Sequence, residues 1–260
     1  MNPLYFQCAA RSAVGLVRSG NEDSALTSAH LIAVADGMGG HAGGEVASSV
    51  AIDTLSEIAP TFTNPDTDHE SASDLFMNSL HTIDGQIKAV TQDEPQLAGM
   101  GTTLTALFIS ASEISLLHVG DSRAYRLRGN ELEQLSEDHT VLQELLSKGI
   151  ISESEAQVHP QRSMLTQALM GEGNLEPSLH VFEGKIKDRY LVCSDGLTGV
   201  LSDKEIKSLI KGKDSAAAVD ALIDATYING APDNVTVILA DLVESKTNDV
   251  EKLGAAKDNE

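Results

Sequence analysis

Four aspartates in this sequence stand beside glycine, serine or asparagine near short apolar segments. They are Asp36 in VADGMGG, Asp121 in VGDSRAY, Asp195 in CSDGLTG and Asp233 in APDNVTV. Asp-Gly and Asp-Asn pairs are common in turns, so a turn is the better interpretation of any single one. The four together are harder to explain as turns. Three of them adjoin a predicted strand, which would bring their carboxylates to the rim of a sheet.

Carboxylate oxygens without a nearby histidine or cysteine pair favour hard cations. We therefore expect Mg²⁺, Mn²⁺ or Ca²⁺ at these aspartates rather than zinc. The chain carries 18 Lys and Arg against 39 Asp and Glu, a formal net charge of −21. A phosphate substrate would then meet positive charge at a bound metal rather than at a basic patch. The same charge argues against DNA, RNA or an anionic membrane as a partner.

The elements that must position these carboxylates can be predicted from the apolar pattern. Segments rich in β-branched residues predict strands at 31–35, 102–109, 114–120, 124–128, 190–194 and 234–242. Apolar residues at spacings of three and four predict helices along 47–58, 76–90, 141–149, 203–211 and 215–230. Strands interrupted by helix pairs indicate sheets covered by helices rather than a regular βαβ alternation.

The rest of the sequence predicts the domain organisation and the cellular compartment of the protein. We expect one domain over residues 1–242, followed by a disordered acidic tail over residues 243–260. Two isolated cysteines, Cys8 and Cys193, are typical of a reducing compartment. No signal peptide or membrane-spanning run is recognisable, so the sequence predicts a cytoplasmic protein.

A dinucleotide site is the main rival interpretation of the first aspartate motif. The segment LIAVADGMGGHA matches the glycine-rich fingerprint in its G-x-G-x-x-A form, and Glu57 follows at a fitting distance. Glu57, however, falls inside a predicted helix rather than at the end of a second strand. Asp36 would also place negative charge beside a pyrophosphate. We therefore regard this alternative as the weaker one.

Seven motifs occur in an order that resembles one known family. They are VRSGNED (17–23), VADGMGGHAGGEVAS (34–48), GMGTTL (99–104), VGDSRAY (119–125), LTQALMGEG (165–173), DRYLVCSDGL (188–197) and PDNVTVI (232–238). Together they resemble the metal-dependent protein phosphatases of the PPM type, also called type 2C, and above all the compact bacterial members. The match extends over about residues 10 to 242, and seven spaced motifs make an accidental match very improbable.

The resemblance implies a fold, an activity and a cofactor. The fold would be α+β, a four-layer sandwich of two mainly antiparallel sheets flanked by helix pairs, with a flap subdomain at about residues 136–175. The activity would be hydrolysis of phosphoserine and phosphothreonine on proteins. The cofactor would be Mg²⁺ or Mn²⁺, two or three ions in number. A hydroxide shared by two such ions would attack phosphorus in line.

Residue roles follow from the same resemblance. Asp36 would bridge two metals, and the carbonyl of Gly37 would complete the second site. Asp195 and Asp233 would hold the first metal. Asp121 matches the position that, together with Asp195, binds a third metal in bacterial relatives.

The NED segment and the arginine before it extend this set. Glu22 and Asp23 match acidic residues that hold waters around the metals. Arg18 matches a guanidinium that grips the substrate phosphate, and its fork geometry suits that oxyanion. Cys193 could suggest a thiolate nucleophile, but its place inside an apolar strand indicates a core residue.

One departure concerns the acid that protonates the leaving group. Animal relatives have a histidine directly after the Asp-Gly pair, whereas here Met38 stands there and a histidine follows at His41. Either His41 from its shifted position or a metal-bound water could supply the proton. His159 and Arg162 lie in the stretch that resembles the flap, where we expect them to contact substrate.

Two classes of function remain open from the sequence. The first is an active, monomeric phosphatase whose partners are phosphorylated proteins, such as the substrates of a serine/threonine kinase. The second is a catalytically silent module of the same fold that binds phosphoproteins. The presence of all four aspartates favours activity.

Overall fold

Two antiparallel sheets form the centre of the computed structural model, which describes residues 3–39, 43–64, 67–152, 155, 164–175, 178–246 and 250–257. The five-stranded sheet has the order β1-β11-β10-β7-β8, and the seven-stranded sheet has the order β12-β2-β3-β5-β6-β9, with β4 paired to β3. Strands of the first are β1 (Tyr5–Ala13), β7 (Arg123–Arg128), β8 (Glu131–Gln134), β10 (Arg189–Cys193) and β11 (Val235–Val243). Strands of the second are β2 (Asp23–Thr27), β3 (Leu31–Met38), β4 (Gly101–Thr102), β5 (Leu104–Ser110), β6 (Glu113–Val119), β9 (Ser178–Glu183) and β12 (Glu251–Gly254).

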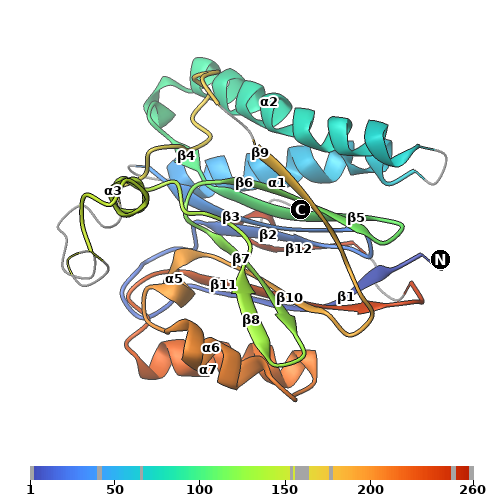
Figure 1. Cartoon of the computed structure of the whole chain (residues 1–260). Coiled ribbons are helices and arrows are strands. Elements are labelled where there is room, and N and C mark those ends of the chain that lie inside the picture. The colour runs from blue at the N-terminus through green and yellow to red at the C-terminus, as the bar shows by residue number, and fades with distance from the viewer. Residues whose placement is uncertain are drawn as a thin grey trace.

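Helices cover the outer face of each sheet, so the molecule has four layers (Figure 1). Helices α1 (Gly43–Phe62) and α2 (His69–Asp93) lie on the seven-stranded sheet, and α6 (Asp203–Ile210) and α7 (Ser215–Ile228) lie on the five-stranded sheet. Shorter elements are α3 (Val141–Ser147), α5 (Asp195–Thr198), η1 (Pro95–Leu97) and η2 (Ala255–Lys257). The predicted α+β sandwich of two antiparallel sheets flanked by helices is confirmed.

Both faces of the central strands are apolar, because each of these strands lies between two hydrophobic cores. In β3, Leu31 and Ala33 pack toward α1 and α2, whereas Ile32 and Val34 pack between the sheets. Strand β11 behaves in the same way, since its odd-numbered residues from Val235 to Leu239 face the helices on the other side. Because successive side chains of a strand point to opposite faces, a strand between two cores reads as one continuous apolar run. Three apolar layers thus hold four structural layers together.

The tail is where the structure departs from the sequence-based prediction. Residues 243–260 were expected to be disordered, yet Glu251–Gly254 forms β12 and pairs antiparallel with β2. Ala255 and Ala256 behind it are buried, and the amide of Ala256 donates to Ser24 Oγ at 3.1 Å. The prediction failed because small residues that fill a tight space contribute little to hydrophobicity. Strands β1, β2, β8 and β9 also escaped prediction.

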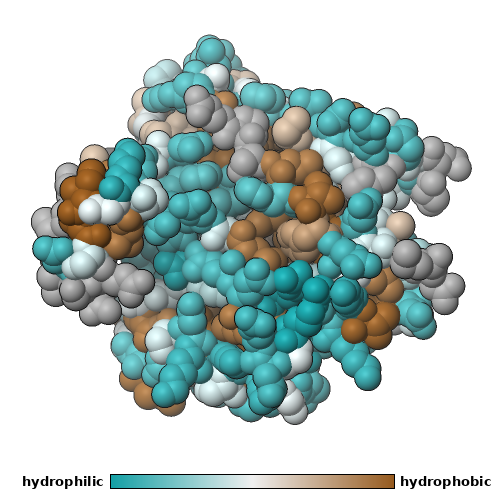
Figure 2. All heavy atoms as spheres, viewed as in Figure 1, coloured by the Kyte–Doolittle hydropathy of each residue, from teal (hydrophilic) through white to brown (hydrophobic). Residues whose placement is uncertain are grey.

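The visible surface is largely hydrophilic, as Figure 2 shows, with apolar groups gathered over α3 and around β9. On β9, Val181 is 47% exposed. Among the described helices, none combines the length and the apolar character that crossing a membrane requires.

Candidate metal centre

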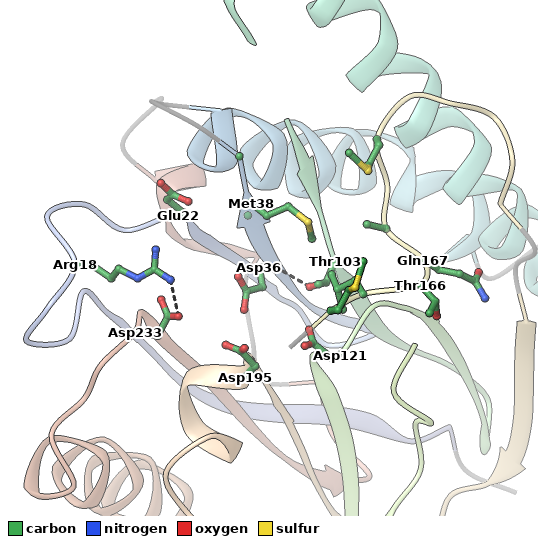
Figure 3. Close-up of a pocket in the computed structure, with 16 residues that line it drawn as sticks. Arg18, Glu22, Asp36, Met38, Thr103, Asp121, Thr166, Gln167, Asp195 and Asp233 are labelled. Atoms are coloured by element: carbon green, nitrogen blue, oxygen red, sulfur yellow. Dashed lines mark hydrogen bonds and ion pairs between the residues drawn. The ribbon is translucent and has the colours of Figure 1, made fainter. Parts of the chain in front are cut away.

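The four predicted aspartates line one cavity of about 720 Å³ (Figure 3). Both sheets contribute: Asp36 lies in β3 and Asp121 follows β6, while Asp195 begins α5 directly after β10 and Asp233 precedes β11. Residues almost 200 positions apart therefore meet because the ends of their strands meet at one edge of the sandwich. Arg18, Glu22 and Gly37 line the same cavity.

Asp36 is fixed through its backbone by two threonines of the GMGTTL segment. Its amide donates to Thr103 Oγ1 at 3.0 Å, and its carbonyl accepts from the Thr103 amide at 2.9 Å and from Thr102 Oγ1 at 3.0 Å. Thr103 Oγ1 also lies 2.6 Å from Ser122 Oγ. These bonds leave the carboxylate of Asp36 free to face the cavity. In the sequence, the only signal for Thr102 and Thr103 is that they form a Thr-Thr pair after the glycines of the GMGTTL segment.

Burial and crowding raise the pKa values of the cavity carboxylates. The pKa of Asp36 is raised well above its ordinary value by burial first, and then by the negative charges of Asp23 and Asp195. Burial, followed by the charge of Asp233, raises the pKa of Asp195. The pKa of Asp121 is raised to about 7 by burial and by the charge of Asp195. Such a cluster is stabilised by protons or by cations.

The predicted neighbours Glu22 and Asp23 differ in exposure. Glu22 lines the cavity, and burial raises its pKa. Asp23 is 1% exposed and accepts from Ser194 Oγ at 2.7 Å through Oδ2, whereas its Oδ1 has no hydrogen-bond partner among the described residues. A buried carboxylate oxygen without a partner is costly, and it is a donor atom suited to a cation or to water around one.

Arg18 reaches the cavity from a loop that Asn234 holds. Its guanidinium Nη2 lies 2.7 Å from Asp233 Oδ2, and its side chain is half exposed. Asn234 accepts from the Glu22 amide at 2.8 Å and donates to the carbonyls of Val14 and Gly20 at 2.9 and 2.8 Å. Asn234 thus ties both ends of this loop to the Asp233 segment. The sequence gives no local signal for this role, because the partners of Asn234 lie more than 200 residues away.

The glycines after Asp36 allow β3 and α1 to approach closely. A Cβ at Gly37 would lie 2.0 Å from the carbonyl oxygen of Gly44. A Cβ at Gly44 would lie 2.3 Å from a carboxylate oxygen of Glu22. The glycine-rich segment therefore serves close packing behind the aspartates. Among the described strands, the neighbours of β3 are β2, β4 and β5, all antiparallel, whereas a dinucleotide-binding fold has parallel strands there, so the dinucleotide interpretation is wrong.

The opposite wall of the cavity is formed by the LTQALMG segment. Thr166 and Gln167 lie across the cavity from Arg18 and Glu22 in Figure 3. The predicted acid His41 and the predicted flap contacts His159 and Arg162 lie outside the described residues. Cys193, expected in the core, is fully buried, and burial raises its pKa to about 12.

The donor set fits a hard divalent cation in type, because every candidate ligand is an oxygen. Within the described residues, no three acidic, histidine or cysteine side chains are gathered as a finished metal site. The raised pKa values of Asp36 and Asp121, and the Asp23 Oδ1 that has no hydrogen-bond partner among the described residues, favour a bound cation.

A second cavity of about 540 Å³ adjoins the first and shares Asp121, Asp195 and Asp233 with it. It is lined on its other side by residues of α3 and by the Arg123–Asp138 pair, whose atoms lie 2.6 Å apart. Asp121 and Asp195 thus face open space on two sides.

Comparison with known proteins places this geometry in a family. The sequence pattern of the family described as Protein phosphatase 2C matches residues 21–236. The serine/threonine protein phosphatase PstP of Mycobacterium tuberculosis is 43% identical over 244 residues, which are 93% of this chain and 46% of that protein. The chain thus spans about half the length of that relative.

Two further matches extend this comparison. The serine/threonine phosphatase stp of Listeria welshimeri is 37% identical over 233 residues, or 87% of this chain and 92% of that protein. The crystal structure of the PstP catalytic domain in complex with two manganese ions matches with a TM-score of 0.83 at 40% identity, covering 92% of this chain and 99% of that one.

Proposed function

We propose that this chain, which belongs to the protein phosphatase 2C family, removes phosphate from phosphoserine and phosphothreonine in proteins. It would do so with the help of bound Mn²⁺ or Mg²⁺. The family predicted from the seven motifs is confirmed. The observation that supports the activity best is the convergence of four aspartates from two sheets on one cavity that also holds Arg18.

The proposed ligand roles are those that the motif positions imply. Asp36 and the carbonyl of Gly37 would contact two ions, Asp195 and Asp233 would hold the first of these, and Asp121 with Asp195 would hold a third. Glu22 and Asp23 would hold water around them. Ions bound there would activate water as a nucleophile at neutral pH and neutralise charge on the phosphate.

The chain's own residues would bind and orient the ester. Arg18 would donate to the phosphate oxygens, and its flexible, half-exposed side chain allows it to turn from Asp233 toward a substrate. The carboxylates of Asp36 and Asp195 would stay in place because their backbones are anchored in β3 and at the start of α5. The seryl oxygen must gain a proton as it leaves, and the sequence offers His41 or a water on the Asp121 side.

The test is phosphate release from a phosphothreonine peptide and from para-nitrophenyl phosphate, each with Mn²⁺ and with EDTA. We expect turnover of both substrates with Mn²⁺ and none with EDTA. Peptide binding without turnover in Mn²⁺ would instead support the silent phosphoprotein-binding module.

A further inference from the structure

The cavity has two chemically different sides. The side formed by the aspartates and Glu22 is acidic, whereas the opposite wall is mainly apolar and includes Met164, Leu165, Ala168 and Met170. Met164 is 53% exposed and Met170 is 37% exposed. Methionine side chains are flexible and polarizable, so they contact apolar groups of varied shape. A peptide whose phosphate points at the acidic side would lay its neighbouring residues against this wall.

A buried aspartate outside the cavity holds one end of the wall. Asp84 lies in α2 and is 5% exposed. Its Oδ1 accepts from the amides of Met170 at 3.2 Å and Gly171 at 2.7 Å, and its Oδ2 accepts from the amide of Gly173 at 2.9 Å. One carboxylate therefore binds three amides of the same turn with its two oxygens, and its negative charge strengthens these bonds.

The turn itself is built to approach α2. Gly171 has a φ of +76°, and a Cβ there would lie 2.8 Å from the backbone of Lys88. Directly before the turn, Leu169 and Thr102 exchange two backbone hydrogen bonds of 2.9 and 3.0 Å. Because Thr102 also binds the carbonyl of Asp36, the wall and the aspartate side share one framework.

The other end of the wall is held separately. The Thr166 amide donates to the carbonyl of His139 at 2.9 Å, and the Val141 amide donates to the carbonyl of Met164 at 2.9 Å. The segment between these two anchors is only a few residues long. Release of the Asp84 anchor would free Met170 and the residues next to it while leaving the aspartates and Arg18 in place.

We propose that Asp84 is a positioning residue for substrate recognition: it holds an apolar, methionine-bearing wall that contacts the peptide residue beside the phosphorylated one. The inference rests on the proposed phosphatase activity and adds a preference for substrates with an apolar neighbour at that position. Asp84 touches neither the phosphate nor the metal ligands.

The test uses two phosphothreonine peptides that differ only in Leu or Gln beside the phosphothreonine, assayed with Mn²⁺ at saturation. For the unmodified chain we expect kcat/KM about fivefold higher for the Leu peptide, the effect of partly burying one apolar side chain. In Asp84→Asn this ratio should fall below about twofold, with the loss mainly in KM. Amide hydrogen exchange at Met170, Gly171 and Gly173 should become faster.

Two further variants separate positioning from general damage. Asp74→Asn makes the same change of charge on an exposed part of α2 and should leave the ratio and the exchange rates unchanged. Gly171→Ala should disturb the same contact from the side of the turn and change the ratio and the exchange rates as Asp84→Asn does. If one of the two variants folds poorly, the other still tests the proposal.

Three outcomes decide against the inference. If the unmodified chain is active but has the same kcat/KM for both peptides, the wall does not contact the neighbouring residue and the proposal is wrong. If the ratio of kcat/KM between the two peptides and the amide exchange rates are unchanged in both Asp84→Asn and Gly171→Ala, Asp84 does not position the wall. Absence of turnover on either peptide and on para-nitrophenyl phosphate overturns the proposed function itself, and the exchange rates then test the anchor alone.

Discussion

Arg18 has two possible negatively charged partners, the carboxylate of Asp233 and the phosphate of a substrate. In the structure its guanidinium pairs with Asp233, a proposed metal ligand, and the hydrogen bond to Asp233 raises the pKa of Arg18. A cation beside this carboxylate competes with a metal ion for it. The same cation is suited to bind the phosphate of a substrate.

We therefore predict that Arg18→Ala weakens binding of a phosphopeptide and strengthens binding of Mn²⁺. The KM for a phosphopeptide should rise about tenfold with a smaller fall in kcat, because a phosphate grip present before and during the reaction is mainly uniform binding. The Kd for Mn²⁺ should fall severalfold, because Asp233 loses its competing cation. Calorimetry and steady-state kinetics measure both, with Arg18→Lys as the control that keeps the charge. A phosphopeptide KM equal to that of the unmodified chain would contradict the assigned role.

Thr103 tests the support behind Asp36. Thr103→Val keeps the shape of the side chain but leaves the Asp36 amide without its acceptor and Ser122 without its partner. Removal of one partner from buried polar groups commonly costs about 1–3 kcal/mol, so the Tm should fall by several degrees. Turnover should fall further than in Thr103→Ser, which retains the hydroxyl. Equal activity of the two variants would show that the Asp36 backbone needs no such support.

At the scale of elements, strand β12 ties the C-terminal segment to the site. Its Gly254 has a φ of +69°, and a Cβ there would lie 2.1 Å from the carbonyl oxygen of Asp23. The pairing of β12 with β2 thus packs directly on the strand that begins at Asp23.

Removal of residues 246–260 should therefore destabilise the protein and weaken its metal site together. The exposed edge of β2 and the loss of buried Ala255 and Ala256 should lower the Tm by several degrees, and more Mn²⁺ should be needed for half-maximal activity. Deletion of residues 258–260 alone is the matched control. Unchanged Tm and Mn²⁺ requirement after the longer deletion would mean that β12 contributes nothing to either.

The sequence allowed prediction of those features that depend on local pattern. Continuous apolar runs gave the central strands, such as β3 and β11, and the motif aspartates do line one cavity. Edge strands such as β9 and β12 carry mixed polarity, so periodicity did not reveal them. Contacts such as Asn234 with Val14, or Asp84 with Gly171, join distant positions through the fold, and no spacing in the sequence encodes them.

At the scale of the whole molecule, the chain has a net charge of −21, and five of its carboxylates line one cavity: Glu22, Asp36, Asp121, Asp195 and Asp233. The pKa of Asp121 in the fold, about 7, exceeds its ordinary value of 3.8. A carboxyl group with a raised pKa stabilises the fold fully below its unfolded pKa. That stabilisation is lost as the pH rises through the folded pKa.

In EDTA, the Tm of Asp121→Asn relative to that of the unmodified chain should therefore increase as the pH rises from 5 to 8. A gain of about 2–4 °C corresponds to roughly 1 kcal/mol for a chain of this size. Added Mn²⁺ should cancel the advantage of the variant, because the ion then stabilises the carboxylate form. A difference in Tm that does not change with pH would contradict the burial of a titrating carboxyl at this position.

If the aspartates hold metal for phosphoester hydrolysis, activity depends both on Mn²⁺ and on the charge of Asp36. Phosphate release from a phosphothreonine peptide is measured against Mn²⁺ concentration for the unmodified chain and for Asp36→Asn, whose side chain is nearly the same size but uncharged. We expect saturable activation of the unmodified chain and a loss of at least about 100-fold in the variant at every Mn²⁺ concentration. Near-normal activity of Asp36→Asn at saturating Mn²⁺, or activity of the unmodified chain in EDTA, would contradict this expectation.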